Sequence, residues 1–284
     1  MVLGLAAGVM AAPSFTINPD AIPGSTLGST FTADSISVGN SSELLTLTNL
    51  AGFPGGSASG SGWAQFSGFS NGGPVVGAAI HRLTVDYGLY LTFDITAVRT
   101  AGGLGSPGSD YSVTQLDFKV WADPGFTNVF TAATAAGVSG TAASIAGAGN
   151  DILLGFGRLV PGTGSASITL GSGVGINTLN SFSTCSGLGT TEVPTLDPFA
   201  ALCPAGGVGA AYFDQPTPFH QLAFTALNNT AQGATLSSDN LHLAVQAAGR
   251  VDFANVVPEP GSLALVGLSL LGLGASTLRK RKSV

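Results

Sequence analysis

Cys185 and Cys203 are the only two thiols in the sequence, and they enclose a short segment of Gly, Pro and hydroxyl residues. An even, closely spaced cysteine pair in an oxidising compartment is typical of a disulfide. The alternatives are that both cysteines are free thiols or that they are ligands in a metal site. We therefore predict a disulfide that fixes a loop with little hydrophobic core of its own.

The acidic residues could support glycoside hydrolysis or calcium binding. Hydrolysis needs two carboxyl groups that flank a cleft, but Glu43 and Glu192 lie in no recognisable acid/base motif. Residues 123–128 and 150–151 place Asp and Asn oxygens in turns, where calcium could bind weakly, although neither segment resembles an EF-hand loop. Ordinary turn residues explain them better. We expect no catalytic residue, cofactor or dedicated metal site, with weak calcium binding as the alternative.

Histidine and serine chemistry is not indicated either. His81, His220 and His242 are far apart and have no metal-ligand spacing. No serine lies in a Gly-x-Ser-x-Gly motif between a strand and a helix, as a hydrolase nucleophile would. The sequence therefore favours a protein that is not an enzyme.

Three features follow one another at the C-terminal end. They are Pro258, Glu259 and Pro260, the uncharged residues 261–278, and the bases Arg279, Lys280, Arg281 and Lys282. A helix over 261–278 would be about 27 Å long, which just spans a hydrocarbon core of roughly 30 Å. Clustered bases stay on the cytoplasmic side. The pattern predicts a transmembrane helix with the body outside the inner membrane; a buried core helix is the alternative.

This order resembles the PEP-CTERM sorting signal of Gram-negative bacteria, here residues 258–284. In that family an exosortase recognises the tripeptide and is thought to cleave near it. The resemblance implies transient anchoring in the inner membrane, processing by an exosortase and a final place at the cell surface or in the extracellular matrix. It describes the protein's destination and not its activity.

The N-terminal end also has the features of an export signal. Residues 1–11 are apolar, and Val9, Met10 and Ala11 fit a small-residue cleavage pattern for signal peptidase. A basic n-region is missing, so we interpret these residues as part of a signal peptide that begins upstream. A buried first strand is the alternative.

The body shows a second resemblance, to the flocculation-associated PEP-CTERM proteins. The similar blocks, in order, are FTINPDAIPG, FTADSISVGNSSELLTL, LYLTFDITAV, DFKVWADPG, NDILLGFGRLVPGTGSASI, AAYFDQPTPFHQLAF and GRVDFANVVPEP. The resemblance implies an exported, non-enzymatic protein that promotes flocculation or biofilm aggregation with exopolysaccharide. The alternative is a secreted carbohydrate-active enzyme that uses the same sorting tail.

The composition fits an exported, turn-rich β protein. Only 8% of residues are charged, and 42 of 284 are Gly, whereas globular proteins carry about 25% charged residues. Without the basic tail, five bases face fifteen acids. Nucleic acid is therefore not an expected partner, since binding it needs a basic surface.

Alternating residues predict strands throughout residues 12–257. In residues 89–98, Leu89, Leu91, Phe93, Ile95 and Ala97 share one face, as in a half-buried strand. Further strands are predicted at 43–50, 63–66, 115–121, 166–170, 222–227, 241–247 and 250–253, and residues 131–149 are expected to form a loop or edge strand. We expect an all-β fold with a single antiparallel β-sandwich, of which a jelly roll is one form.

Overall fold

The computed structural model describes residues 13–25, 29–48, 56–102, 108–169, 173–185, 202–203, 206–228 and 233–254. All of them belong to one unit, Met1–Ala254. The predicted partial signal peptide (1–11) and the predicted membrane helix (261–278) lie outside the described residues.

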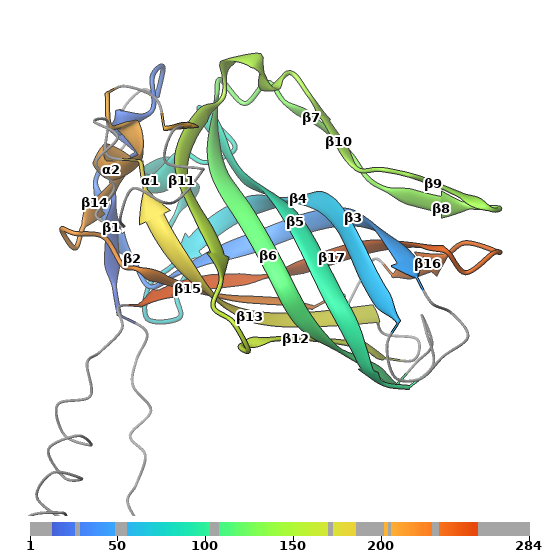
Figure 1. The fold of residues 1–284 in the computed structure, drawn as a ribbon. Coiled ribbons are helices and arrows are strands. Elements are labelled where there is room, and N and C mark those ends of the chain that lie inside the picture. The colour runs from blue at the N-terminus through green and yellow to red at the C-terminus, as the bar shows by residue number, and fades with distance from the viewer. Residues whose placement is uncertain are drawn as a thin grey trace, which may run out of the picture. The chain divides into compact units, whose positions relative to one another are not determined.

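One antiparallel sheet forms the body, and it closes on itself (Figure 1). Its strands are β3 (Ser35–Thr48), β4 (Ser57–Ser70), β5 (Tyr87–Ala101), β6 (Ser109–Pro124), β12 (Gly164–Thr169), β13 (Gly173–Thr184), β15 (Leu222–Asn228) and β17 (His242–Ala254). The order β13-β12-β6-β5-β4-β3-β17-β15 closes because β15 also pairs with β13.

A further strand, β11 (Ile152–Leu159), shares one position of the closed sheet with β12. β12 pairs with residues 109–113 of β6 and 173–177 of β13. β11 pairs with the other halves of the same two strands, at residues 117–122 and 180–184. Two short strands thus fill the space between two long ones.

The inner face of this sheet contains the hydrophobic core. The predicted apolar face of β5, from Leu89 to Ala97, is buried at every second residue. Its neighbours in the core come from β3, β6, β13 and β17. The expected all-β, antiparallel structure is confirmed, but the two-sheet sandwich is wrong. Alternation predicts that a strand has one buried face, but not whether that face packs against a second sheet. Here β13 pairs with β15, so the strands on the opposite side of the core belong to the same sheet.

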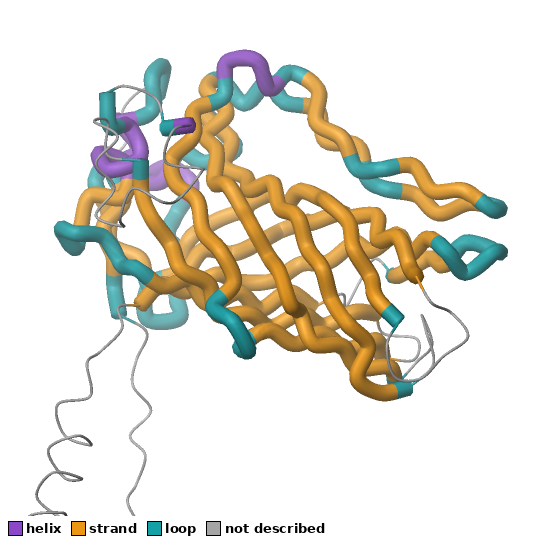
Figure 2. Tube along the Cα trace, viewed as in Figure 1, coloured by secondary structure: helices purple, strands orange, loops and turns teal. Residues whose placement is uncertain are grey.

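Short elements gather at one end of the closed sheet (Figure 2). They are β1 (Phe15–Ile17), η1 (Pro19–Ala21), β2 (Phe31–Ala33), α1 (Ala78–His81), α2 (Val208–Tyr212) and β14 (Phe213–Gln215). The ring of Phe213 lies 5.5 Å from Phe182 and 4.8 Å from Phe219, measured between centroids. Phe15 and Phe253 are in edge contact at 5.3 Å. These aromatic rings pack against the core at this end.

Residues 129–146 form an arm outside the closed sheet. β7 (Val129–Thr131) pairs with β10 (Ser144–Ala146), and β8 (Thr134–Ala136) pairs with β9 (Ser139–Thr141). The short helix η2 (Ala148–Asn150) follows the arm, and β16 (Ala234–Leu236) pairs with β17. The stretch expected to be a loop or edge strand is therefore a two-stranded ribbon, visible in Figure 1.

Side-chain contacts hold the arm against β3, β4 and β5. Phe130 packs edge-on against Trp63 and Tyr90, with centroid distances of 5.1 and 5.2 Å. Trp63 Nε1 donates a hydrogen bond of 3.2 Å to the Thr131 carbonyl. The backbone N–H of Ala133 donates to Ser42 Oγ at 2.8 Å. The arm therefore buries outward-facing residues that alternation alone would leave exposed.

Candidate functional site

Cys185 and Cys203 form the predicted disulfide, with their Cα atoms 5.3 Å apart. The bridge lies in a small apolar cluster with Leu153 and Phe156 of β11. The backbone N–H of Cys185 also donates to the Leu154 carbonyl at 2.8 Å. The bridge thus attaches Cys203 to a residue that follows β13 of the closed sheet.

The two acidic turns considered for calcium lie side by side. Asp123 is fully buried at the end of β6. One of its carboxylate oxygens accepts from the backbone N–H of Thr127 at 3.0 Å, and the other from that of Asn128 at 2.8 Å. Asn150 Nδ2 donates to the Pro124 carbonyl at 3.2 Å. Both oxygens of Asp123 are therefore engaged in forming its own turn.

Asp151 connects the second turn to β5. Its Oδ2 accepts from Asn128 Nδ2 at 2.7 Å and from the Tyr90 hydroxyl. Burial and the nearby Asp151 carboxylate raise the pKa of Tyr90. Within the described part of the chain, no group of three or more His, Cys, Asp or Glu could hold a metal ion. The arrangement is that of a hydrogen-bonded pair of turns.

The three histidines lie in different elements and make different contacts. His81 is buried at the end of α1, and its Nδ1 accepts from the Leu83 N–H at 3.0 Å. Burial lowers the pKa of His81. His220 Nε2 lies 3.4 Å from the Ser14 carbonyl oxygen, and His242 begins β17. The structure does not bring them together.

Glu43 is a functional candidate that no sequence motif indicated. It lies in the middle of β3, opposite Val245 of β17 and Gly62 of β4. Its side chain is only 3% exposed, and its Oε1 has no hydrogen-bond partner. A Cβ at Gly62 would lie 2.8 Å from Glu43 Cβ and 2.9 Å from Phe93 Cζ. The absence of a side chain at Gly62 therefore provides space for the Cβ of Glu43 and for the Phe93 ring.

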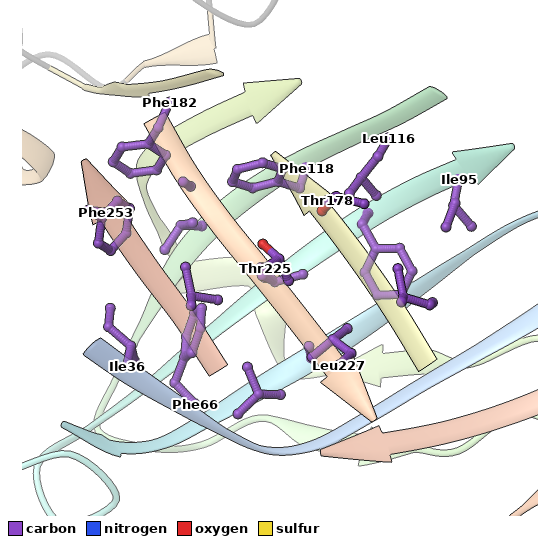
Figure 3. A pocket seen from close by; sticks show the side chains of 18 of the residues that line it. Ile36, Phe66, Ile95, Leu116, Phe118, Thr178, Phe182, Thr225, Leu227 and Phe253 are labelled. Carbon is purple, nitrogen blue, oxygen red and sulfur yellow. The ribbon is translucent and has the colours of Figure 1, made fainter. Parts of the chain in front are cut away.

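Two cavities inside the closed sheet meet at Glu43. The larger, about 40 Å³, is lined mainly by apolar side chains, shown in part in Figure 3. The smaller, about 30 Å³, continues past Leu45 and Leu47 on the same strand. Both linings contain Glu43, Ile95 and Ile176. Glu43 therefore lines both cavities, whose other lining residues are mainly apolar.

Two threonine side chains also line the larger cavity. Thr178 of β13 and Thr225 of β15 line it, and both are labelled in Figure 3. Asn180 Nδ2 donates to Thr178 Oγ1 at 2.9 Å and lies 3.4 Å from Thr225 Oγ1. The Asn180 side chain of β13 therefore donates to the hydroxyls of both threonines, whereas Glu43 Oε1 has no hydrogen-bond partner.

Burial raises the pKa of Glu43 to about 7. The cause is the loss of water around the carboxylate, which favours the neutral acid. A group with such a pKa can be neutral or charged near neutral pH. One feature of the sequence pointed to this position: Glu43 shares its face with Leu45 and Leu47. Leu44 on the opposite face made that signal ambiguous.

The predicted sorting residues 258–260 and 279–282 lie outside the described residues. In the part of the chain that the structure describes, no helix has the length and hydrophobicity needed to cross a membrane. A family model of the PEP-CTERM protein-sorting motif matches residues 256–281. Comparisons with curated proteins and with solved structures find no significant match.

The match covers the predicted tripeptide, the uncharged segment and the first three bases of the tail. It defines the class: an exported protein that an exosortase processes. In particular, the chain is a PEP-CTERM sorting domain protein, as the resemblance at its C-terminal end predicted.

Proposed function

We propose that the exported body becomes part of the cell surface or extracellular matrix and promotes flocculation with exopolysaccharide. The sorting motif at residues 256–281 is the observation that carries this proposal, because it sends the body out of the cell. The body itself consists of a closed sheet with few charges on its surface.

The composition supports a matrix role. With residues 12–257 retained, five bases face fourteen acids, for a formal charge of −9. Exposed Ser, Thr and Asn side chains offer neutral hydrogen bonds to a polysaccharide, and exposed carboxylates such as Asp20, Asp94 and Asp110 offer contacts to cations. The rival function, a secreted carbohydrate-active enzyme, would need a pair of carboxyl groups.

Deletion of the gene tests the proposal, with floc formation and total exopolysaccharide measured together. We expect flocs to be lost while the polysaccharide is still made, and the full-length chain to restore them. The Glu259→Ala chain should not restore them, because its body would stay membrane-retained as a precursor. Unchanged flocs in the deletion strain would contradict the proposal, whereas release of glycan fragments by the purified protein would favour the enzyme.

A further inference from the structure

A groove lies where β4 and β5 separate. The pairing of these two strands ends at Gln65 and Tyr90, although β4 continues to Ser70. Beyond the last pair, Phe66 of β4 and Leu89 of β5 line a pocket of about 170 Å³. We call this pocket the β4–β5 groove. Its volume is several times that of either cavity at Glu43, which are about 40 and about 30 Å³.

Two β-bulges shape one side of the β4–β5 groove. The register between β3 and β4 shifts on both sides of Val38, so neither Gly39 nor Ser67 has a partner in this pairing. Both residues line the groove. A Cβ at Gly39 would lie 2.7 Å from Ser67 Cβ, so this position needs glycine. Bulges redirect neighbouring side chains and are frequent beside functional sites.

Two amide side chains lie next to each other in the groove. Asn40 is opposite Gln65 in the β3–β4 pairing, and both line the groove. Asn40 Oδ1 is buried and has no hydrogen-bond partner within the protein. An amide group offers donors and an acceptor, and a hydroxyl group does the same. This pair of amides therefore suits a ligand that carries several hydroxyl groups.

An exposed aromatic ring lies at the same groove. Phe126 is 45% exposed and has a φ of 52°, which is uncommon for a bulky residue. The Asp123 turn holds it there, since the backbone N–H of Phe126 donates to the Asp123 carbonyl at 3.2 Å. A Cβ at Gly88 would lie 3.1 Å from Phe126 Cδ2, so the ring rests against a residue without a side chain. The negative face of an aromatic ring attracts polarised C–H groups.

The size and charge of the groove limit what it can hold. A cavity of about 150 Å³ accepts one benzene ring, so the groove has room for one six-membered ring. Ser67 and Thr84 line it and are exposed, so substituents of that ring can extend into solvent. None of the residues that line it is an acid or a base. A charged ligand would lose hydration there without gaining an opposite charge.

We propose that the β4–β5 groove binds one neutral pyranose unit with equatorial substituents, as in a β-linked glucan. One C–H face of the sugar packs on Phe126, and its hydroxyl groups bond to Asn40 and Gln65. Equatorial substituents leave the ring faces flat and apolar, as packing on an aromatic ring requires. This inference rests on the proposed function, because it names the class of polysaccharide that the exported body holds.

Saturation-transfer NMR on the purified exported protein tests the proposal. The probes are methyl β-D-glucopyranoside and methyl β-D-glucuronide, which differ only in the carboxylate of the second. We expect transfer to the glucoside, strongest at the axial protons of one ring face, and competition by cellotetraose. The glucuronide should bind at least tenfold more weakly. Equal affinity for the two probes, or no transfer to the glucoside at high millimolar concentration, would overturn the proposal.

Three variants assign the site. Phe126→Leu removes the aromatic face but stays apolar, and should weaken glucoside binding about three- to tenfold. Phe126→Tyr keeps the ring and should bind as wild type. Gln65→Ala removes one amide and should also weaken binding about three- to tenfold. Val138→Ala, outside the groove, is the control and should bind as wild type. Unchanged glucoside binding in both Phe126→Leu and Gln65→Ala would refute the proposal.

The outcome is separate from that of the proposed function. Sugar binding is measured on the purified protein, whereas the proposed function is scored by floc formation in the deletion strain. If the deletion abolishes flocs while the glucoside does not bind, the matrix role stands and the groove is not its sugar site. Urea unfolding midpoints close to that of wild type check that each variant is folded.

Discussion

At the scale of single residues, Glu43 should make stability depend on pH. Burial raises its pKa from 4.5 to about 7, so the folded state binds the proton more tightly than the unfolded state. The stability contributed by the neutral acid is fully present below about pH 4.5 and is lost as the pH rises through about 7. A shift of this size corresponds to roughly 3 kcal/mol.

Urea unfolding at several pH values checks this prediction. Between pH 4.5 and 8, the free energy of unfolding of wild type should fall relative to that of Glu43→Gln, which cannot ionise. The comparison cancels other groups, including His81, whose lowered pKa acts in the opposite direction. Asp94→Asn should show the wild-type dependence. Parallel curves for wild type and Glu43→Gln would contradict the burial of an unpaired carboxyl group.

Gly62 should tolerate no side chain, because the strand beside it and the Phe93 ring occupy the space. A Cβ there would lie 2.4 Å from the Ser42 carbonyl oxygen. We expect Gly62→Ala to lower the free energy of unfolding by about 1–3 kcal/mol through overpacking. Gly68→Ala on the same strand is the matched control, since nothing lies within 4 Å of its Cβ. Equal unfolding midpoints in urea for the two variants would show that the strands adjust freely at Gly62.

At the scale of elements, the arm formed by residues 129–146 should be held mainly by Phe130. Its ring contacts Trp63 and Tyr90, and aromatic pairs contribute about 0.5–1.5 kcal/mol each. Phe130→Ala should speed amide hydrogen exchange in the arm by about tenfold or more, and leave the middle of β5 protected. Val138→Ala, at a residue that is 70% exposed, should leave exchange unchanged. Faster exchange throughout the sheet in Phe130→Ala would instead show that the arm and the sheet unfold together.

At the scale of the whole molecule, the acidic body should need a bridging cation to hold cells together. Two surfaces of formal charge −9 repel each other at low ionic strength. Sodium only screens this repulsion, over a Debye length of about 10 Å at 0.1 M. Calcium takes oxygen ligands that two partners can share. The turn residue Asp123 cannot contribute, because it is buried and both its oxygens accept hydrogen bonds.

We therefore expect a chelator to disperse flocs, and calcium to restore them better than sodium at equal ionic strength. Asp20→Asn combined with Asp110→Asn removes two exposed charges and should reduce the advantage of calcium. Equal recovery in the two salts would leave screening as the explanation. Flocs that respond to neither salt would point to neutral hydrogen bonding.

Much of the sheet followed from local patterning. The alternation of Leu89 to Ala97 correctly predicted the strand and its buried face, since successive side chains point to opposite sides. β17 joins two predicted strands, 241–247 and 250–253, into one. β11 and β13 were not predicted, because glycines such as Gly155, Gly157 and Gly175 interrupt their hydrophobic pattern.

Only the tertiary structure explains why glycine is required at these positions. A Cβ at Gly157 would lie 2.1 Å from the Ser181 carbonyl oxygen and 2.4 Å from the Phe118 ring. Neighbouring strands approach closely there, and a residue without a side chain leaves the space they need. The weak strand signal and the close packing therefore have the same physical origin.

The sequence by itself determined the all-β class, the cysteine pair and the sorting motif, because each depends on residues near one another in the chain or on their composition. The tertiary structure decided that the sheet closes on itself and that Glu43 faces its interior. Both depend on hydrogen bonds between strands far apart in sequence, such as β13 with β15, and no local pattern encodes which strands pair. Because the sheet closes, Glu43, one of fifteen acidic residues, is buried and lines two apolar cavities.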